Sequence, residues 1–284
     1  MTSNATPFQM DLRQTVKLVV YALLLVNFAL YIADDIRVAS YTMRNGGSFL
    51  DWTSAFTTTI DESAWFILLL LFELETYVLS DEIQRRPGVL LLVHGMRLLC
   101  YASLTHSVYA FGLTYLDISQ VTAINGVSDL CQYVGTELSF VRNLEYTDIN
   151  AITCNTLSNA NEFFFTEPDL VVTDASGLAL ETRLALVDVL EVLVWLSILF
   201  TIEVMVWLQD RDITRSKLIT GIKWAKTILY TSLWCAAAYW ASLGHWYFAW
   251  DEALWIVGFF AIEMNVSEWK KEIEETQTET AESI

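Results

Sequence analysis

The sequence predicts an all-α, polytopic membrane protein with six transmembrane helices, arranged as three repeated helical hairpins with an extracytoplasmic cap. Three observations lead to this prediction. Of the 284 residues, 54% are hydrophobic and only 18% are charged. Six apolar segments are long enough to cross about 30 Å of hydrocarbon as helices. A pattern of polar residues recurs in every second segment, which is typical of a repeat architecture.

The charge balance excludes one class of partner. The chain has 34 Asp and Glu residues against 16 Lys and Arg residues, a formal net charge of −18. Binding to a phosphate backbone requires clustered Lys and Arg, so we expect no nucleic-acid partner. The expected environment is the lipid bilayer.

The apolar segments define the predicted spans and, with them, the division of the chain. The six spans lie near Thr15–Ala33, Ser63–Ser80, Val89–Tyr115, Leu184–Leu208, Leu218–Ser242 and Ala253–Ser267. The resulting parts are a cytoplasmic N-terminus (1–14), hairpin repeat 1 (15–83), hairpin repeat 2 (84–213) with an extracytoplasmic insert (117–181), hairpin repeat 3 (214–273) and an acidic cytoplasmic tail (274–284).

The insert is long enough to form a small extramembrane cap. Within it, residues 119–145 are predicted to be helical because apolar residues recur there at a spacing of three or four. Residues 155–178 are predicted to form a loop. The apolar residues that carry the helical prediction are Leu130, Val134, Leu138, Val141 and Leu144.

The positions of Lys and Arg predict the orientation in the membrane. With both termini in the cytoplasm, twelve of the sixteen basic residues lie on the inner side, and only Arg37, Arg44, Arg142 and Arg183 lie outside. The outer side carries most of the acidic residues. The prediction is therefore a multi-pass protein of the cell inner (plasma) membrane with cytoplasmic N- and C-termini.

Two of the four cysteines lie in the extracytoplasmic insert. Cys131 and Cys154 would face an oxidising compartment, whereas Cys100 and Cys235 lie inside predicted spans. We predict a Cys131–Cys154 disulfide, which would contribute roughly 3 kcal/mol in the chain-entropy model. The alternative is a pair of free thiols.

The even-numbered spans share an ungapped pattern: an acid, three residues, Trp, seven residues, Glu, eight residues, an acid and Ile. Repetition of the whole pattern three times at constant spacing predicts that the hairpin is the repeating unit. The three copies are Asp61, Trp65, Glu73, Glu82, Ile83; Glu191, Trp195, Glu203, Asp212, Ile213; and Asp251, Trp255, Glu263, Glu272, Ile273.

The odd-numbered spans share a shorter pattern in the same register. A basic residue is followed four positions later by Tyr, then by a small residue and, two positions further, by Leu. The base and Tyr pairs are Lys17 and Tyr21, Arg97 and Tyr101, and Lys226 and Tyr230.

The repeated Glu has two interpretations. An intramembrane carboxylate is costly unless paired, so it marks either a structural link or a functional site. In the first interpretation each hairpin is closed by a Tyr–Glu hydrogen bond and a base–Glu ion pair, which joins Tyr21 and Lys17 to Glu73, Tyr101 and Arg97 to Glu203, and Tyr230 and Lys226 to Glu263. In the second, the three Glu face a pseudo-three-fold axis and hold a proton or cation. Glu75 has no counterpart in the other hairpins, so both interpretations predict that Glu203→Gln is tolerated less well than a change at Glu75.

The remaining features suggest no chemistry. Trp65, Trp195 and Trp255 lie one turn into their spans, as in an interfacial aromatic belt. The histidine and cysteine spacings fit neither a metal site nor haem, so we expect no metal, no cofactor and no enzyme. Two functions remain: an ion or proton pathway or channel subunit that uses the repeated Glu, and a non-catalytic scaffold or complex subunit that binds a partner through its outer cap. A homo-oligomer or a partner membrane protein suits either function.

Overall fold

The computed structural model describes residues 12–75, 79, 81–84, 86–160, 162–167, 169–209, 211 and 217–260. The protein is predominantly helical, as predicted. Its helices are α1 (Leu12–Thr42), α2 (Phe49–Ala55), α3 (Thr57–Glu73), α4 (Asp81–Gln84), α5 (Pro87–Ser119), α6 (Cys154–Leu157), α7 (Ala175–Gln209) and α8 (Lys217–Ser242). A further helix covers residues 246–260.

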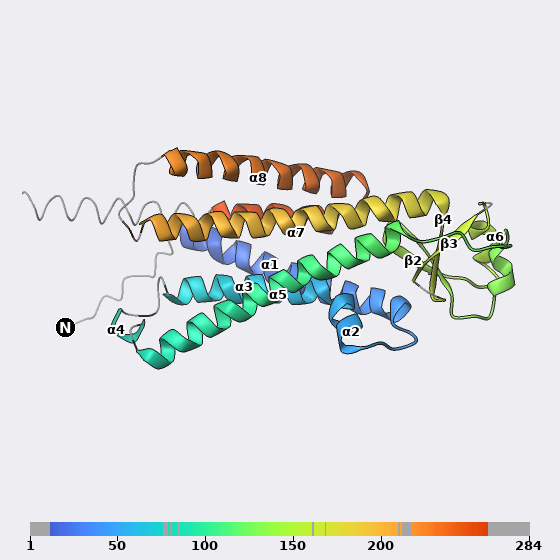
Figure 1. Ribbon diagram of the computed structural model, residues 1–284, viewed down its shortest axis with the longest axis horizontal. Helices are drawn as coiled ribbons and strands as arrows, with labels where there is room; N and C mark the ends of the chain where they lie inside the picture. The colour runs from blue at the N-terminus through green and yellow to red at the C-terminus, as the bar shows by residue number, and fades with distance from the viewer. Residues whose placement is uncertain are drawn as a thin grey trace, which may run out of the picture. The chain divides into compact units, whose positions relative to one another are not determined.

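The chain forms two compact units. The larger comprises Leu30–Leu229, and the smaller comprises Met1–Ala29 together with Tyr230–Ile284. In the larger unit, α5 packs against both α3 and α7 (Figure 1). In the smaller unit, a short turn at Leu243 and Gly244 connects α8 to the helix over residues 246–260.

Three helices are long and apolar enough to cross a membrane: Lys17–Thr42, Pro87–Ser119 and Ala175–Met205. They correspond to the predicted first, third and fourth spans. α2 and α3 also pass this test together, but they meet at a bend of 72°. α8 covers the predicted fifth span. The helix over residues 246–260 covers the beginning of the sixth, and the rest of that span lies outside the described residues.

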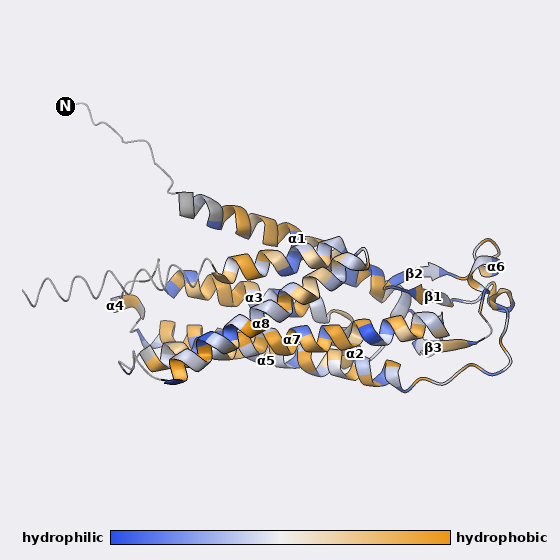
Figure 2. Ribbon diagram, turned by 90° about the horizontal axis from the view of Figure 1, so that it is seen from above, coloured by the Kyte–Doolittle hydropathy of each residue, from blue (hydrophilic) through white to orange (hydrophobic). Residues whose placement is uncertain are grey.

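These helices expose apolar side chains, as a lipid-facing surface does. Figure 2 shows hydrophobic residues along much of their length. The exposed residues include Val26 on α1, Leu91 and Leu98 on α5, Phe200 on α7 and Ile228 on α8. Such extensive apolar exposure would be unfavourable in water and suits contact with lipid tails. The structure therefore supports a membrane-associated protein.

A four-stranded sheet forms the centre of the cap, which lies beyond the ends of α5 and α7 (Figure 1). Its strands are β1 (Ser139–Arg142), β2 (Glu145–Asp148), β3 (Phe163–Glu167) and β4 (Val171–Asp174), in the order β2-β1-β4-β3. The β1–β2 and β3–β4 pairs are antiparallel, and β1 and β4 are parallel. The cap core is apolar and includes Leu130, Leu138, Phe140, Ile149, Phe163 and Val172.

The predicted secondary structure of the cap was wrong. Residues 119–145 contain the end of α5, a 3₁₀ turn (Leu130–Tyr133) and β1 rather than one helix, and residues 155–178 contain β3 and β4 rather than a loop. Asn143 and Leu144 both have positive φ, at 56° and 59°, and form the two-residue connection between β1 and β2. A tight hairpin of this kind cannot continue a helix. Leu138, just before β1, and Val141 in β1 are both buried but belong to different apolar clusters, so their spacing of three imitated a helical face.

The Cys131–Cys154 disulfide is confirmed. It joins the 3₁₀ turn to α6, with the two Cα atoms 4.8 Å apart. Cys154 belongs to the cap core, and Cys131 packs against it. The disulfide therefore links two short segments that have few backbone hydrogen bonds of their own, and it limits how far the cap core can open.

Candidate functional site

Two polar contacts join α5 to its neighbours in the apolar part of the larger unit. Arg97 and Tyr101 lie one turn apart on α5 and therefore share a face. The Arg97 guanidinium forms an ion pair with Glu75, with Nη2 2.5 Å from Oε2. The Tyr101 hydroxyl donates a hydrogen bond to Oε1 of Glu203 on α7. One face of α5 thus binds two carboxylates, Glu75 after α3 and Glu203 on α7.

The sequence predicted that a Tyr–Glu hydrogen bond and a base–Glu ion pair close each hairpin, and we call these residues the predicted clamp. The two contacts of α5 bring part of the predicted clamp together. Tyr101 and Glu203 form one of the three expected Tyr–Glu pairs, and both residues lie in the larger unit. The expected partner of Arg97 was Glu203, but Arg97 forms its ion pair with Glu75. Sequence reasoning passed over Glu75 because the other copies of the repeat have no equivalent residue. Its position two residues beyond Glu73 was the available signal.

The other predicted clamp residues are divided between the two units. Glu73 is the last residue of α3. Lys17 and Tyr21 lie in the smaller unit, where the Lys17 ammonium is 5.8 Å from the centre of the Tyr21 ring. Lys226 and Tyr230 lie one turn apart on α8. Glu263 lies outside the described residues.

The repeated Trp residues have partners inside the protein. The Trp65 indole N–H donates to Oδ2 of Asp61 at 3.1 Å, so in this copy the spacing of acid and Trp has a local cause. The Trp65 ring meets Trp195 edge-on, with centroids 5.9 Å apart. Trp65 and Trp255 are buried. Two equivalent positions of the repeat therefore pack together, and the interfacial belt stays a prediction.

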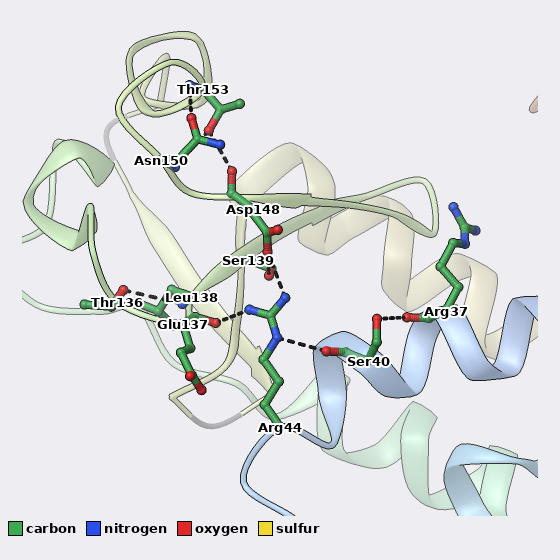
Figure 3. A network of polar contacts seen from close by, with 10 residues as sticks. All are labelled: Arg37, Ser40, Arg44, Thr136, Glu137, Leu138, Ser139, Asp148, Asn150 and Thr153. Carbon is green, nitrogen blue, oxygen red and sulfur yellow. Dashed lines mark hydrogen bonds and ion pairs between the residues drawn. The ribbon is translucent and has the colours of Figure 1, made fainter.

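A second polar site joins the end of α1 to the cap (Figure 3). Arg44, two residues beyond α1, donates from Nη2 to Oδ1 of Asp148 on β2 at 2.8 Å and from Nη1 to the carbonyl of Glu137 at 2.5 Å. Its Nε donates to the carbonyl of Ser40 on α1 at 2.9 Å. One guanidinium thus binds the helix and the sheet at once, and we call this group the Arg44 bridge.

Aromatic stacking supports the Arg44 bridge. Tyr41 on α1 stacks on Tyr146 of β2 with ring centroids 5.2 Å apart. The Arg44 guanidinium lies 5.0 Å from the centre of the same Tyr41 ring. A guanidinium over an aromatic face is attractive because the ring carries a negative face. The end of α1 therefore contacts β2 through both a charged and an apolar group.

Several cap side chains have shifted pKa values, among them Asp148, Glu167 and Tyr146. The Arg44 hydrogen bond lowers the pKa of Asp148, against slight desolvation and with a smaller contribution from Ser139. Burial raises the pKa of Glu167 to about 7, and repulsion from Asp117 and Asp51 adds to this. Burial also raises the pKa of Tyr146, with nearby Glu181 and Glu167 acting in the same direction. The junction between cap and helices is therefore rich in carboxylates.

Sequence reasoning missed the Arg44 bridge. Arg44 entered only as one of the few outer basic residues. Its partners Glu137 and Asp148 are 93 and 104 residues away in the chain. No local spacing connects residues so far apart, and only the packing of the cap against α1 brings them together.

These features define the class of protein that the structure supports: a helical, membrane-associated protein with a small mixed α/β cap tied to its first helix. Among the described residues, no group of three or more His, Cys, Asp or Glu side chains could hold a metal ion. No protein-family model, curated protein or solved structure matches the chain.

Proposed function

We propose that this protein is a non-catalytic membrane scaffold or complex subunit that presents its cap to a partner protein. The observation that carries the proposal is the Arg44 bridge, which fixes the sheet to the end of α1. A cap held by an ion pair, a ring stack and an internal disulfide is preorganised, and preorganisation lowers the entropic cost of binding.

The carboxylates between the helices favour the same function. Glu75 and Glu203 are bound by Arg97 and Tyr101 of a neighbouring helix. Polar links of this kind hold membrane helices in register at modest net gain. A carboxylate that serves a link between two helices is less available to carry an ion.

The cap also offers a contact for a partner. Ile152 is 87% exposed, although the neighbouring Asn150 side chain fixes its turn by accepting from the Ile152 and Thr153 backbone N–H groups. A rigidly held, exposed apolar side chain is a common anchor at protein interfaces. Acidic residues far outnumber basic ones in the cap sequence, which favours a partner with basic residues around an apolar patch.

The test compares the native complex of the wild type with that of a cap variant. The protein is extracted from its own membrane in mild detergent, and the mass of the complex is measured by native electrophoresis. Ile152→Asp should shift the protein to a smaller species, whereas the exposed control Thr156→Asp should not. A wild-type protein that migrates alone would contradict the proposal.

A proton or cation pathway is the second candidate, and one observation favours it. Glu203 remains exposed on the helix surface although it accepts the Tyr101 hydrogen bond. In a homo-oligomer, copies of Glu203 could face a common axis and share a proton. Proton and Na⁺ flux into liposomes would then fall in Glu203→Gln. Absence of flux in the wild type would eliminate this candidate.

For location we propose the plasma membrane, with both termini in the cytoplasm and the cap outside. The distribution of Lys and Arg supports this orientation. The disulfide agrees with it, because such bonds persist in oxidising compartments. Labelling of intact cells with an impermeant reagent should modify a cysteine introduced at Ile152 and spare one introduced at either terminus.

A further inference from the structure

Asn27 on α1 is an unusual residue of the smaller unit. Its side chain is 1% exposed. Neither its amide nitrogen nor its amide oxygen has a hydrogen-bond partner among the residues that the structure describes. A buried amide without partners is costly, so it indicates either a frustrated position or a bound polar molecule.

A close contact fixes the register of α1 against the helix over residues 246–260. Gly258 faces Val20, since a β-carbon at Gly258 would lie 3.6 Å from Cγ1 of Val20. The two helices run in opposite directions within the smaller unit (Figure 1). Asn27 follows Val20 by seven residues, and Asp251 precedes Gly258 by seven. Each is therefore about 10 Å from the contact, at the same level.

The separation of seven residues also places the Asn27 and Asp251 side chains on the surfaces by which the two helices face each other. Seven residues make nearly two helical turns, so Asn27 shares a face with Val20, and Asp251 shares a face with Gly258. Asp251 is 6% exposed, and its Oδ1 atom is fully buried. Between the two levels, Leu24 and Leu254 are buried and close the interface with apolar groups. A carboxamide and a carboxylate thus lie opposite each other within an apolar interface.

We propose that Asn27 and Asp251 form a buried hydration site that binds one water molecule between the two helices. The water accepts a hydrogen bond from Nδ2 of Asn27 and donates to Oδ1 of Asn27 and to the Asp251 carboxylate. A buried water typically has two to four polar partners, which these atoms supply. A metal cation fits less well because one carboxamide and one carboxylate supply fewer oxygen ligands than such ions require.

The site has a structural consequence for the third predicted hairpin. Asp251 is the acid of the repeated pattern in that hairpin, and the water connects it to α1. The water thereby adds a polar contact between the third predicted hairpin and α1 within this unit.

A double-mutant cycle in lipid nanodiscs tests the proposal through thermal unfolding. If Asn27 has no ligand, Asn27→Leu removes a frustrated amide and should leave Tm unchanged or raise it. If the water is bound, Asn27→Leu should lower Tm, and its effect should be non-additive with that of Asp251→Leu. The matched control is Asp61→Leu, which changes the equivalent acid of the first hairpin and should be additive with Asn27→Leu.

Infrared spectroscopy gives a second measurement that needs no leucine variant. The wild type should show an O–H band of internal water that shifts in H₂¹⁸O and is lost or moved in Asp251→Asn but kept in Asp61→Asn. Asn27→Ser, which retains a donor and an acceptor, should keep the band. An unchanged or raised Tm in Asn27→Leu, an additive cycle with Asp251→Leu, or a wild type without the isotope-sensitive band would each overturn the proposal.

Discussion

Arg44 and Asp148 form an ion pair across the junction of the first helix and the cap, with Nη2 of Arg44 2.8 Å from Oδ1 of Asp148. The Arg44 side chain is 21% exposed and that of Asp148 57%. An ion pair this exposed stabilises weakly by itself. The bond from Arg44 to the Glu137 carbonyl and the contact with Tyr41 make the arginine a connection between two elements.

Replacing Arg44 should loosen the cap without unfolding the helices. Arg44→Ala removes three hydrogen bonds to Ser40, Glu137 and Asp148, and we expect the cap to lose about 1–2 kcal/mol of stability. Amide hydrogen exchange in β1 and β2 should become faster, while exchange in α5 and α7 stays unchanged. Arg183→Ala is the control, because the described contact of Arg183 is with its own helix. Unchanged exchange in β2 would show that Arg44 does not hold the cap.

Breaking the disulfide should destabilise the cap core more strongly. The Cys131→Ser/Cys154→Ser variant should lose roughly 3 kcal/mol in the chain-entropy model. Proteolysis should then cut near α6 in the variant or in reduced wild type, but not in oxidised wild type. Cys235 is an exposed cysteine outside the disulfide. A Cys235→Ser variant should therefore behave as wild type.

Glu167 should make the cap less stable as the pH rises. Burial raises its pKa to about 7 in the folded state, from an ordinary value of 4.5. A raised carboxyl pKa means that the folded state disfavours the charge. The contribution of protonated Glu167 to the stability of the folded cap is therefore fully present below about pH 4.5 and is lost as the pH rises through about 7. We expect the cap to unfold at a lower temperature at pH 8 than at pH 5.

Glu167→Gln should abolish most of this pH dependence, because glutamine does not titrate. The control is Glu162→Gln, at an exposed position just before β3, which should retain the dependence. Circular dichroism of the reconstituted protein over this pH range measures both. A wild-type melting temperature that is the same at pH 5 and pH 8 would contradict the assignment.

The contacts of α5 predict a coupling that sequence reasoning did not expect. Glu75 binds Arg97, so Glu75→Gln should destabilise the helices about as much as Glu203→Gln. The Tyr101→Phe/Glu203→Gln double mutant should show a coupling of about 0.5–1 kcal/mol, typical of a hydrogen bond between membrane helices. Unfolding in mixed micelles measures both effects. A Glu75→Gln variant as stable as wild type would show that the ion pair contributes nothing.

The sequence by itself determined the features that depend on local composition. A long apolar segment suits a helix that crosses a membrane, because a helix bonds its backbone groups internally and the apolar side chains suit lipid. Lys17–Thr42, Pro87–Ser119 and Ala175–Met205 were therefore predictable. The Cys131–Cys154 pair was predictable because only these two cysteines lie in the predicted extracytoplasmic insert.

Only the tertiary structure decided which polar residues meet. The cap sheet depends on β1 lying beside β4, about thirty residues away, and the local spacing of Leu138 and Val141 by three residues is that of a helix face. The repeat pattern predicted that Arg97 pairs with Glu203. The packing of α5 against α3 brings Arg97 to Glu75 instead. Arg44 and Asp148 meet because the cap docks on α1. An ion pair depends on distance in space, and a sequence records only distance along the chain.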